Sequence, residues 1–185
     1  RPGHGATGGP YLEDQGGCAA PDYTRAGQAV ADSIWLALQF IQKQLFARRG
    51  AAVIVGHSAG GWGALALARR NPKDISAIVT FAPGRGGRVD DRPGNVCAPD
   101  RLIAAARAFG RAAKVPVTWL VAQNDSYFPP SLSQQMAEAF EAGGDRVDFR
   151  AVPPFGSEGH WMAEKGDPKI LSFIVTSVLA SERMR

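Results

Sequence analysis

The sequence of 185 residues predicts an α/β fold, a three-layer α/β/α sandwich around a mainly parallel sheet. Four short apolar runs rich in Val and Ile alternate along the chain with longer stretches of helical periodicity. Strands that alternate with such helices are joined by right-handed crossovers, which make the strands parallel and cover both faces of the sheet. The length fits one domain over residues 1–185, and the 45% hydrophobic and 21% charged content is that of an ordinary globular chain.

The expected elements follow one another without a repeat or an interdomain linker. Residues 1–23 are rich in Gly and Pro and predict a loop, and residues 82–98 form a second long irregular stretch. Because this stretch follows a strand, we expect it at the rim of a site. Helices are expected at 24–48, 61–71, 99–113, 131–142 and 168–181, and strands at 51–55, 75–81, 115–122 and 147–152.

The first helix has the clearest pattern. Asp22 or Thr24 can cap its start, and Gly50 lies just past its expected end. The next apolar run, 51–55, is continuous rather than alternating, which predicts a strand buried on both faces of the sheet. The apolar residues of the helix recur at three- and four-residue spacing: Ala26, Val30, Ile34, Leu38, Ile41 and Leu45.

The pentapeptide at 56–60, Gly-His-Ser-Ala-Gly, matches the pattern G-x-S-x-G. The pattern makes a sharp turn from strand to helix that strains the central residue and exposes its hydroxyl, here that of Ser58. We expect Gly56 and Gly60 to be needed because Cβ atoms there would collide with the neighbouring strand and helix. Five residues match by chance often, and a serine in an ordinary Gly-rich turn is the alternative. The strand-like run before the motif and the helical pattern after it favour a nucleophile.

A serine hydroxyl needs a base to take its proton, and the chain has three histidines. His160 is the expected base because it follows the last strand on a loop and precedes the last helix. His57 lies inside the turn, where successive side chains diverge, so we expect it to pack or to orient a loop. His4 lies in the opening loop and is expected at the rim or in solvent.

The third member of such a set orients the histidine and stabilises its charged form. Asp125 follows the strand at 115–122, which gives the chain order Ser58, Asp125, His160 expected for this chemistry. Glu158 is the alternative acid, but it is only two residues from His160, which is awkward geometry. No metal ligand set and no organic cofactor is expected.

Three stretches carry a resemblance to a known family: Gly-His-Ser-Ala-Gly-Gly-Trp-Gly at 56–63, Asn-Asp-Ser-Tyr-Phe at 124–128, and Gly159-His160. With the opening residues 1–10, they resemble the α/β-hydrolase superfamily in its dienelactone-hydrolase-like branch. The resemblance implies the carboxyl-terminal two-thirds of that fold, without its first strands. Members of the branch that act on dienelactone use a cysteine where this chain has Ser58, which makes dienelactone a doubtful substrate.

An oxyanion hole needs two backbone N–H donors. Ala59, the residue after the nucleophile, is expected to supply one. The second is expected upstream of Arg1, on an early loop of the fold, so we expect residues 1–185 alone to be poorly active or unstable.

The predicted function is hydrolysis of a small-molecule carboxylic ester through an acyl-enzyme. Two alternatives stay open: an acyltransferase on the same residues, and a non-catalytic ligand-binding module that keeps the fold. Four aromatic residues flank the predicted site in sequence and either line a pocket or belong to the core or rim: Trp62, Tyr127, Phe128 and Trp161.

Composition narrows the partners and the compartment. The net charge of +4 comes mostly from scattered arginines, without the basic, aromatic-interleaved runs of nucleic-acid binders. No apolar stretch is long enough to span a membrane. Cys18 and Cys97 either pair in a disulfide, which indicates a periplasmic or secreted protein, or remain free thiols. Oligomeric state is not predicted.

Overall fold

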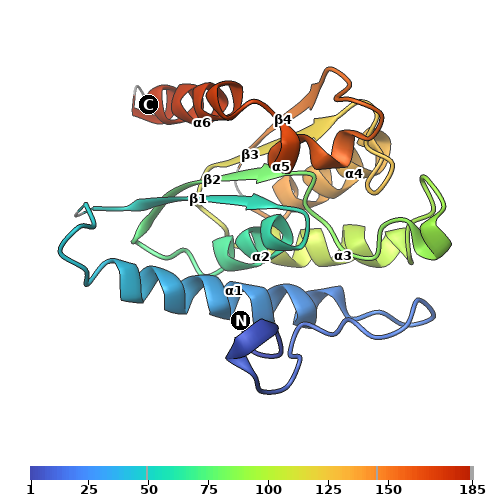
Figure 1. Cartoon of the computed structure of the whole chain (residues 1–185), viewed down its shortest axis with the longest axis horizontal. Helices are drawn as coiled ribbons and strands as arrows, with labels where there is room; N and C mark the ends of the chain where they lie inside the picture. Colours follow the sequence, from blue (N-terminus) through green and yellow to red (C-terminus); the bar gives the residue numbers. More distant parts are fainter. Residues whose placement is uncertain (49, 145, 184–185) are drawn as a thin grey trace.

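The computed structural model describes residues 1–48, 50–144 and 146–183, and in them a four-stranded sheet forms the centre of the molecule. The strands are β1 (Ala52–His57), β2 (Ile75–Phe81), β3 (Val117–Ala122) and β4 (Val147–Val152). They lie in the order β1-β2-β3-β4, and every neighbouring pair is parallel. The carboxyl ends of all four strands therefore meet at one edge of the sheet, as Figure 1 shows.

Helices cover both faces of the sheet, so the predicted three-layer arrangement is confirmed (Figure 1). One face carries α1 (Tyr23–Ile41), α2 (Ala59–Ala68), α3 (Pro99–Gly110) and α4 (Pro130–Glu141), which pack on one another in sequence order. The other face carries α6 (Pro168–Arg183) and the short α5 (Met162–Lys165). Three short 3-10 helices lie in loops, namely η1 (Gly5–Thr7), η2 (Val89–Asp91) and η3 (Gly159–Trp161).

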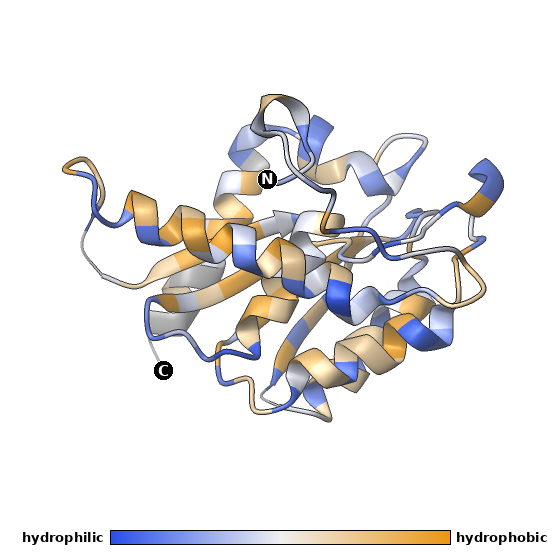
Figure 2. Cartoon of the chain, turned by 90° about the horizontal axis from the view of Figure 1, so that it is seen from below, coloured by the Kyte–Doolittle hydropathy of each residue, from blue (hydrophilic) through white to orange (hydrophobic). Residues whose placement is uncertain are grey.

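The core is divided between the two faces. The larger part lies under α1 to α4 and contains the fully buried rings of Trp62, Phe109 and Trp119. Seen from the side that α1 covers, apolar and polar residues alternate along α1, α3 and α4, as expected when one face of a helix is buried (Figure 2). The smaller part joins Val79, Phe81 and Leu120 of the sheet to side chains of α5 and α6.

Two sequence predictions need correction. The first helix ends at Ile41 rather than near residue 48, and Leu45 is fully exposed, because the chain there has passed the last buried residue of the helix, Leu38. Strand β1 is not buried on both faces, since Val55 is 51% exposed; within the described residues it lies at the edge of the sheet beside β2.

Asp22 is the residue that caps α1, and its carboxylate accepts from the N–H of Arg25.

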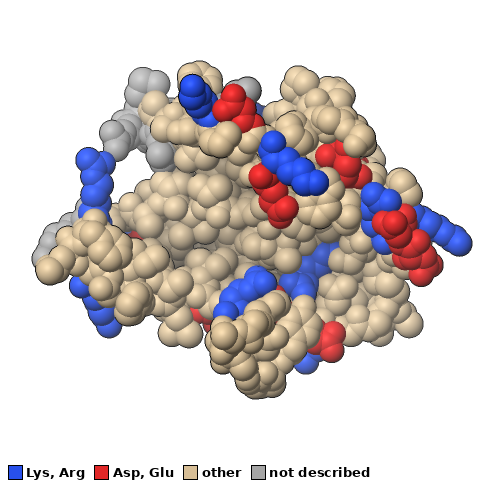
Figure 3. Space-filling view, viewed as in Figure 1, with Lys and Arg blue, Asp and Glu red and all other residues tan. Residues whose placement is uncertain are grey.

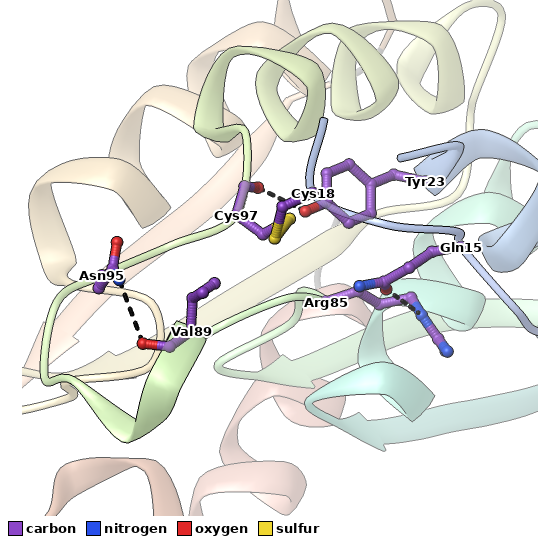
Figure 4. The surroundings of a disulfide bond; sticks show 7 residues. All are labelled: Gln15, Cys18, Tyr23, Arg85, Val89, Asn95 and Cys97. Carbon is purple, nitrogen blue, oxygen red and sulfur yellow. Dashed lines mark hydrogen bonds between the residues drawn. A yellow bond between two sulfur atoms is a disulfide. The ribbon is translucent and has the colours of Figure 1, made fainter. Parts of the chain in front are cut away.

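A disulfide joins the two irregular segments of the chain. The predicted pairing of Cys18 with Cys97 is present, and it links the opening loop to the segment 82–98 (Figure 4). The Tyr23 hydroxyl donates to the Cys97 carbonyl in the same place. Burial raises the pKa of Tyr23 to about 12, although the charge of Arg85 opposes the shift, so this hydroxyl stays a donor at neutral pH.

The surface shows no extended area of one charge on the face drawn in Figure 3, where Lys and Arg are interspersed with Asp and Glu. Within the described ranges, no helix combines the length and the apolar character that crossing a membrane requires.

Helices α1 and α2 approach so closely at Gly63 that a Cβ atom there would lie 2.2 Å from Cγ1 of Val30. We therefore expect Gly63→Ala to destabilise the protein by about 1–3 kcal/mol, the usual cost of overpacking a core. Gly60→Ala, in the same helix, is the control because its Cβ would meet open space, and we expect it to be neutral or slightly stabilising. Thermal denaturation measures both, and equal melting temperatures for the two variants would contradict this description of the packing.

Candidate active site

Ser58 lies in the sharp turn between β1 and α2. Its backbone has φ 50° and ψ −121°, a conformation that costs a non-glycine residue on the order of 1–3 kcal/mol. Three hydrogen bonds hold it there: the Ser58 N–H donates to the Phe81 carbonyl, and the Ser58 carbonyl accepts from Trp62 and Gly84. The turn is thus fixed by β2 and by the loop that follows β2, and its hydroxyl opens into a pocket.

Of the two glycines that the sequence predicted to be needed for close packing, Gly56 is confirmed and Gly60 is not. A Cβ on Gly56 would lie 2.8 Å from Cα of Gly61, so Gly56 is needed where strand and helix approach. A Cβ on Gly60 would meet nothing within 4 Å, so the expectation for Gly60 is wrong. Gly61 is the close neighbour instead, because its Cβ would lie 3.0 Å from Cβ of Pro83.

The structure brings Ser58, Asp125 and His160 together at the carboxyl edge of the sheet. His160 Nε2 is 3.1 Å from Ser58 Oγ, and His160 Nδ1 is 3.1 Å from Asp125 Oδ2. Asp125 lies just beyond β3, and its other carboxylate oxygen accepts from the N–H groups of Tyr127 and Phe128. Both Asp125 and His160 are only 3% exposed, so water competes little for these hydrogen bonds.

This arrangement determines what the imidazole can do. With the Nδ1 proton donated to Asp125, Nε2 of the neutral ring has a lone pair directed at the Ser58 hydroxyl. A ring in this tautomer can remove the proton as Ser58 attacks an electrophile, and the Asp125 carboxylate then faces the positive imidazolium.

Glu158, the alternative acid, has a different place. Its carboxylate accepts from the backbone N–H of His160 and from the N–H and hydroxyl of Ser126, whereas the imidazole Nδ1 faces Asp125. The position beside Nδ1 belongs to Asp125.

A pocket of about 290 Å³ opens over Ser58. Tyr127, Phe128 and Trp161 line it, as does Ala59, the first residue of α2. The Tyr127 ring stacks on the His160 ring with centroids 4.2 Å apart, so it covers one face of the imidazole. The opening loop and the loop after β2 supply further lining residues: Gln15, Gly84, Arg85, Gly86 and Gly87.

Of the two places that the sequence left open for Trp62, the structure shows the core and not the pocket. Trp62 is fully buried in the core, where its indole N–H donates to the Tyr23 carbonyl and its ring packs edge-on against Phe109. The reason is the direction of α2, which turns Trp62 toward α1 and α3 rather than toward Ser58.

Sequence reasoning missed a charged pair at the pocket, in which Arg85 lines the pocket and Glu13 is buried beside it. Arg85 donates to the side chain of Gln15, to the Tyr11 hydroxyl and to the Glu13 carbonyl, and one of its nitrogens lies 3.6 Å from the Glu13 carboxylate. Glu13 is 3% exposed. His4, which is partly exposed, lies 3.6 Å from the same carboxylate. The partners are about 70 residues apart in sequence, so no local pattern points to them.

His57 supports the loop that carries His160. Its Nε2 donates to the His160 carbonyl at 2.8 Å, and its Nδ1 lies 3.3 Å from a carboxylate oxygen of Glu164. Burial lowers the pKa of His57, and the charge of His160 adds to this. The hydrogen bond to the His160 carbonyl and the carboxylate of Glu164 act in the opposite direction without cancelling the shift.

Among residues 1–48, 50–144 and 146–183, no three or more His, Cys, Asp or Glu side chains form a group that could hold a metal ion.

The sequence profile of the alpha/beta hydrolase family matches residues 1–180. The chain belongs to this family. The observed sheet, with a strand, a sharp turn at Ser58 and a helix in succession, is an α/β-hydrolase fold. No curated protein shows significant sequence similarity to this α/β hydrolase.

Solved structures with the same fold include several hydrolases. Est1E from Butyrivibrio proteoclasticus, solved with ferulic acid, aligns with a TM-score of 0.62 and 14% identity over 99% of this chain and 75% of that one. A predicted CIB-like hydrolase from Thermoplasma acidophilum aligns with a TM-score of 0.55 and 17% identity over 96% and 68% of the two chains. A lipase-esterase related protein from Clostridium acetobutylicum aligns with a TM-score of 0.57 and 14% identity over 95% of this chain and 80% of that one. At such identities the likeness shows the fold alone.

The lowered pKa of His57 predicts part of the pH dependence of stability. The unfolded histidine takes up a proton below about pH 6.5, whereas the folded one resists, so stability is lost as the pH falls through this range. In His57→Gln, whose amide can still donate to the His160 carbonyl, we expect a smaller loss. Melting temperatures at about pH 7.5 and about pH 5.5 compare the two proteins. An equal or larger drop in the variant would contradict the assignment.

Proposed function

We propose that this α/β hydrolase cleaves small-molecule carboxylic esters by the hydroxyl of Ser58. The observation that carries the proposal is the hydrogen-bonded series from Ser58 through His160 to Asp125, buried at the edge of a pocket. Est1E and other hydrolases of the same fold agree with it.

The proposed reaction has two halves. Ser58 Oγ attacks the ester carbonyl carbon while His160 Nε2 takes the hydroxyl proton, and a tetrahedral oxyanion forms. The backbone N–H of Ala59, at the positive end of α2, stabilises that oxyanion. His160 then gives the proton to the leaving alkoxide, which departs as the alcohol and leaves Ser58 acylated.

In the second half, water enters the site. His160 removes a proton from the water as its oxygen attacks the acyl carbon, and returns the proton to Ser58 Oγ when the acid leaves. Asp125 keeps its charge throughout and holds the ring in the productive tautomer. The acyl-enzyme thus returns to the starting state without a cofactor.

The pocket limits the substrate. A volume of about 290 Å³ lies at the lower end of the range for small-molecule sites, which favours esters with a small or flat group on one side. Tyr127, Phe128 and Trp161 offer an apolar, aromatic wall to that group. The residues around Ser58 and His160 also support placement in the dienelactone-hydrolase-like branch, and the disulfide supports a periplasmic or secreted location.

The test is covalent labelling of the purified full-length protein with a fluorophosphonate probe, which reacts with activated serines. We expect stoichiometric labelling of the wild type, loss of labelling in Ser58→Ala, and unchanged labelling in Ser131→Ala, an exposed serine on α4. Hydrolysis of p-nitrophenyl acetate should be lost in the same variant. Labelling or hydrolysis that survives Ser58→Ala would rule the proposal out.

A further inference from the structure

Two loops must meet before His160 can face Asp125. The acid lies on the segment after β3, residues 123–129, and the histidine lies on the segment after β4, residues 153–161. The 3.1 Å contact between the two side chains depends on how these segments are held against each other.

Glu158 lies at the point where the segments touch. Through Oε1 it accepts from the N–H of Ser126 at 3.0 Å and from the N–H of His160 at 3.0 Å, and through Oε2 from the Ser126 hydroxyl. The Glu158 carboxylate therefore binds both Ser126, the residue that follows Asp125, and the backbone of His160. The Glu158 side chain is only 14% exposed, so these bonds are largely protected from water.

The segments 123–129 and 153–161 also contact each other closely at the residues around Glu158. The Gly159 N–H donates to the Asn124 carbonyl, and a Cβ on Gly159 would lie 2.8 Å from the backbone nitrogen of Asp125. The Asn124 side chain also accepts from the N–H of Phe155. The segments thus pack backbone to backbone, and Glu158 supplies the charged link between them.

Arg88 connects Glu158 with the pocket residue Tyr127. It comes from the segment 82–98, its Nη1 lies 3.5 Å from Oε2 of Glu158, and its guanidinium lies 5.3 Å from the centre of the Tyr127 ring. Tyr127 in turn stacks on His160. Arg88, Tyr127 and His160 therefore form a layered group whose outer cation is paired with Glu158.

We propose that Glu158 is a positioning residue that clamps the histidine segment to the aspartate segment and so sets the geometry of His160 against Asp125 and Ser58. The proposal rests on the proposed function of these three residues. It assigns Glu158 a role through the backbone, distinct from that of the acid beside the imidazole.

The carboxylate form suits this role, since it accepts from Ser126, His160 and Arg88 and donates none. Burial by itself would raise the pKa of Glu158. The hydrogen bonds from Ser126 and His160 and the charge of His160 outweigh that effect and hold the pKa below its ordinary value.

The experiment compares Glu158→Ala, Glu158→Gln and Asp125→Asn in the full-length protein, with p-nitrophenyl acetate as substrate. Glutamine can still accept from the two N–H groups, so we expect kcat within about tenfold of the wild type. Alanine removes the clamp, and we expect kcat to fall about 10- to 100-fold with little change in KM, the cost of a misplaced catalytic group. Asp125→Asn should cost about 10³- to 10⁴-fold. Glu141→Ala, an exposed acid on α4, is the matched control.

A second readout does not depend on turnover. The proton between His160 Nδ1 and Asp125 is observable by proton NMR as a strongly downfield signal, and we expect it to be kept in Glu158→Gln and lost or broadened in Glu158→Ala. A wild type that shows this proton but hydrolyses no ester would contradict the proposed function while leaving the clamp testable by NMR.

Two results would overturn the clamp: Glu158→Ala with wild-type kcat and an unchanged downfield proton, or Glu158→Gln as impaired as Asp125→Asn, which would make Glu158 the orienting acid. If Glu158→Ala does not fold, Ser126→Ala replaces it. That variant removes the hydroxyl bond to Glu158 and leaves the two backbone bonds, and we expect kcat to fall about three- to tenfold, in line with the loss of roughly one hydrogen bond. A wild-type kcat in Ser126→Ala would then reject the proposal.

Discussion

The hydrogen bond between His160 and Asp125 is the interaction on which the rest of the site depends. It fixes the tautomer of a buried imidazole whose other nitrogen faces the Ser58 hydroxyl. The parallel sheet makes this meeting possible because it brings the ends of β1, β3 and β4 to one edge. Residues separated by about 100 positions along the chain thereby come within hydrogen-bonding distance.

The surrounding structure holds that arrangement from three directions. His57, inside the turn, donates to the backbone of His160, and Glu158 binds the same backbone from the side of Asp125. On the pocket side, Tyr127 covers one face of the ring. A strained backbone at Ser58 persists in this setting because β2 and the following loop determine its hydrogen bonds.

The opening loop contributes to the site, because its residue Gln15 lines the pocket. The disulfide between Cys18 and Cys97 fixes this loop to the segment 82–98, and Arg85 binds it again through Gln15 (Figure 4). Arg85 also donates to the Glu13 carbonyl. In the chain-entropy description, closing a loop of this length stabilises the fold by up to about 4–5 kcal/mol. The same links fix the part of the pocket lining that comes from the opening loop and the segment 82–98.

Those features of the fold and the site that depend on local sequence patterns were predicted from the sequence. The alternation of apolar runs and helical periods predicted the layers, and strand-end positions predicted where Ser58, Asp125 and His160 would meet. The sequence could not decide between pocket and core for Trp62 because α2 is buried almost all round and has no polar face from which to infer a direction. Gly60 was misread because close approach depends on the neighbouring Pro83 and Gly61, which the motif does not specify.

The contacts of Glu13 with Arg85 and of Arg88 with Glu158 could not be predicted at all. Each joins residues about 70 positions apart on irregular segments, where neither periodicity nor a motif sets the distance. Such contacts follow from the folded arrangement of the loops.

The central claim is that Ser58 forms a covalent acyl intermediate, and trapping that intermediate tests it most directly. The full-length protein, mixed with p-nitrophenyl acetate and quenched in acid within the first turnover, would be digested and its peptides weighed by mass spectrometry. The account predicts one acetyl group on the peptide that contains Ser58, located on that serine by fragmentation. Ester turnover with no acylated peptide, or with the acetyl group on another residue, would contradict it.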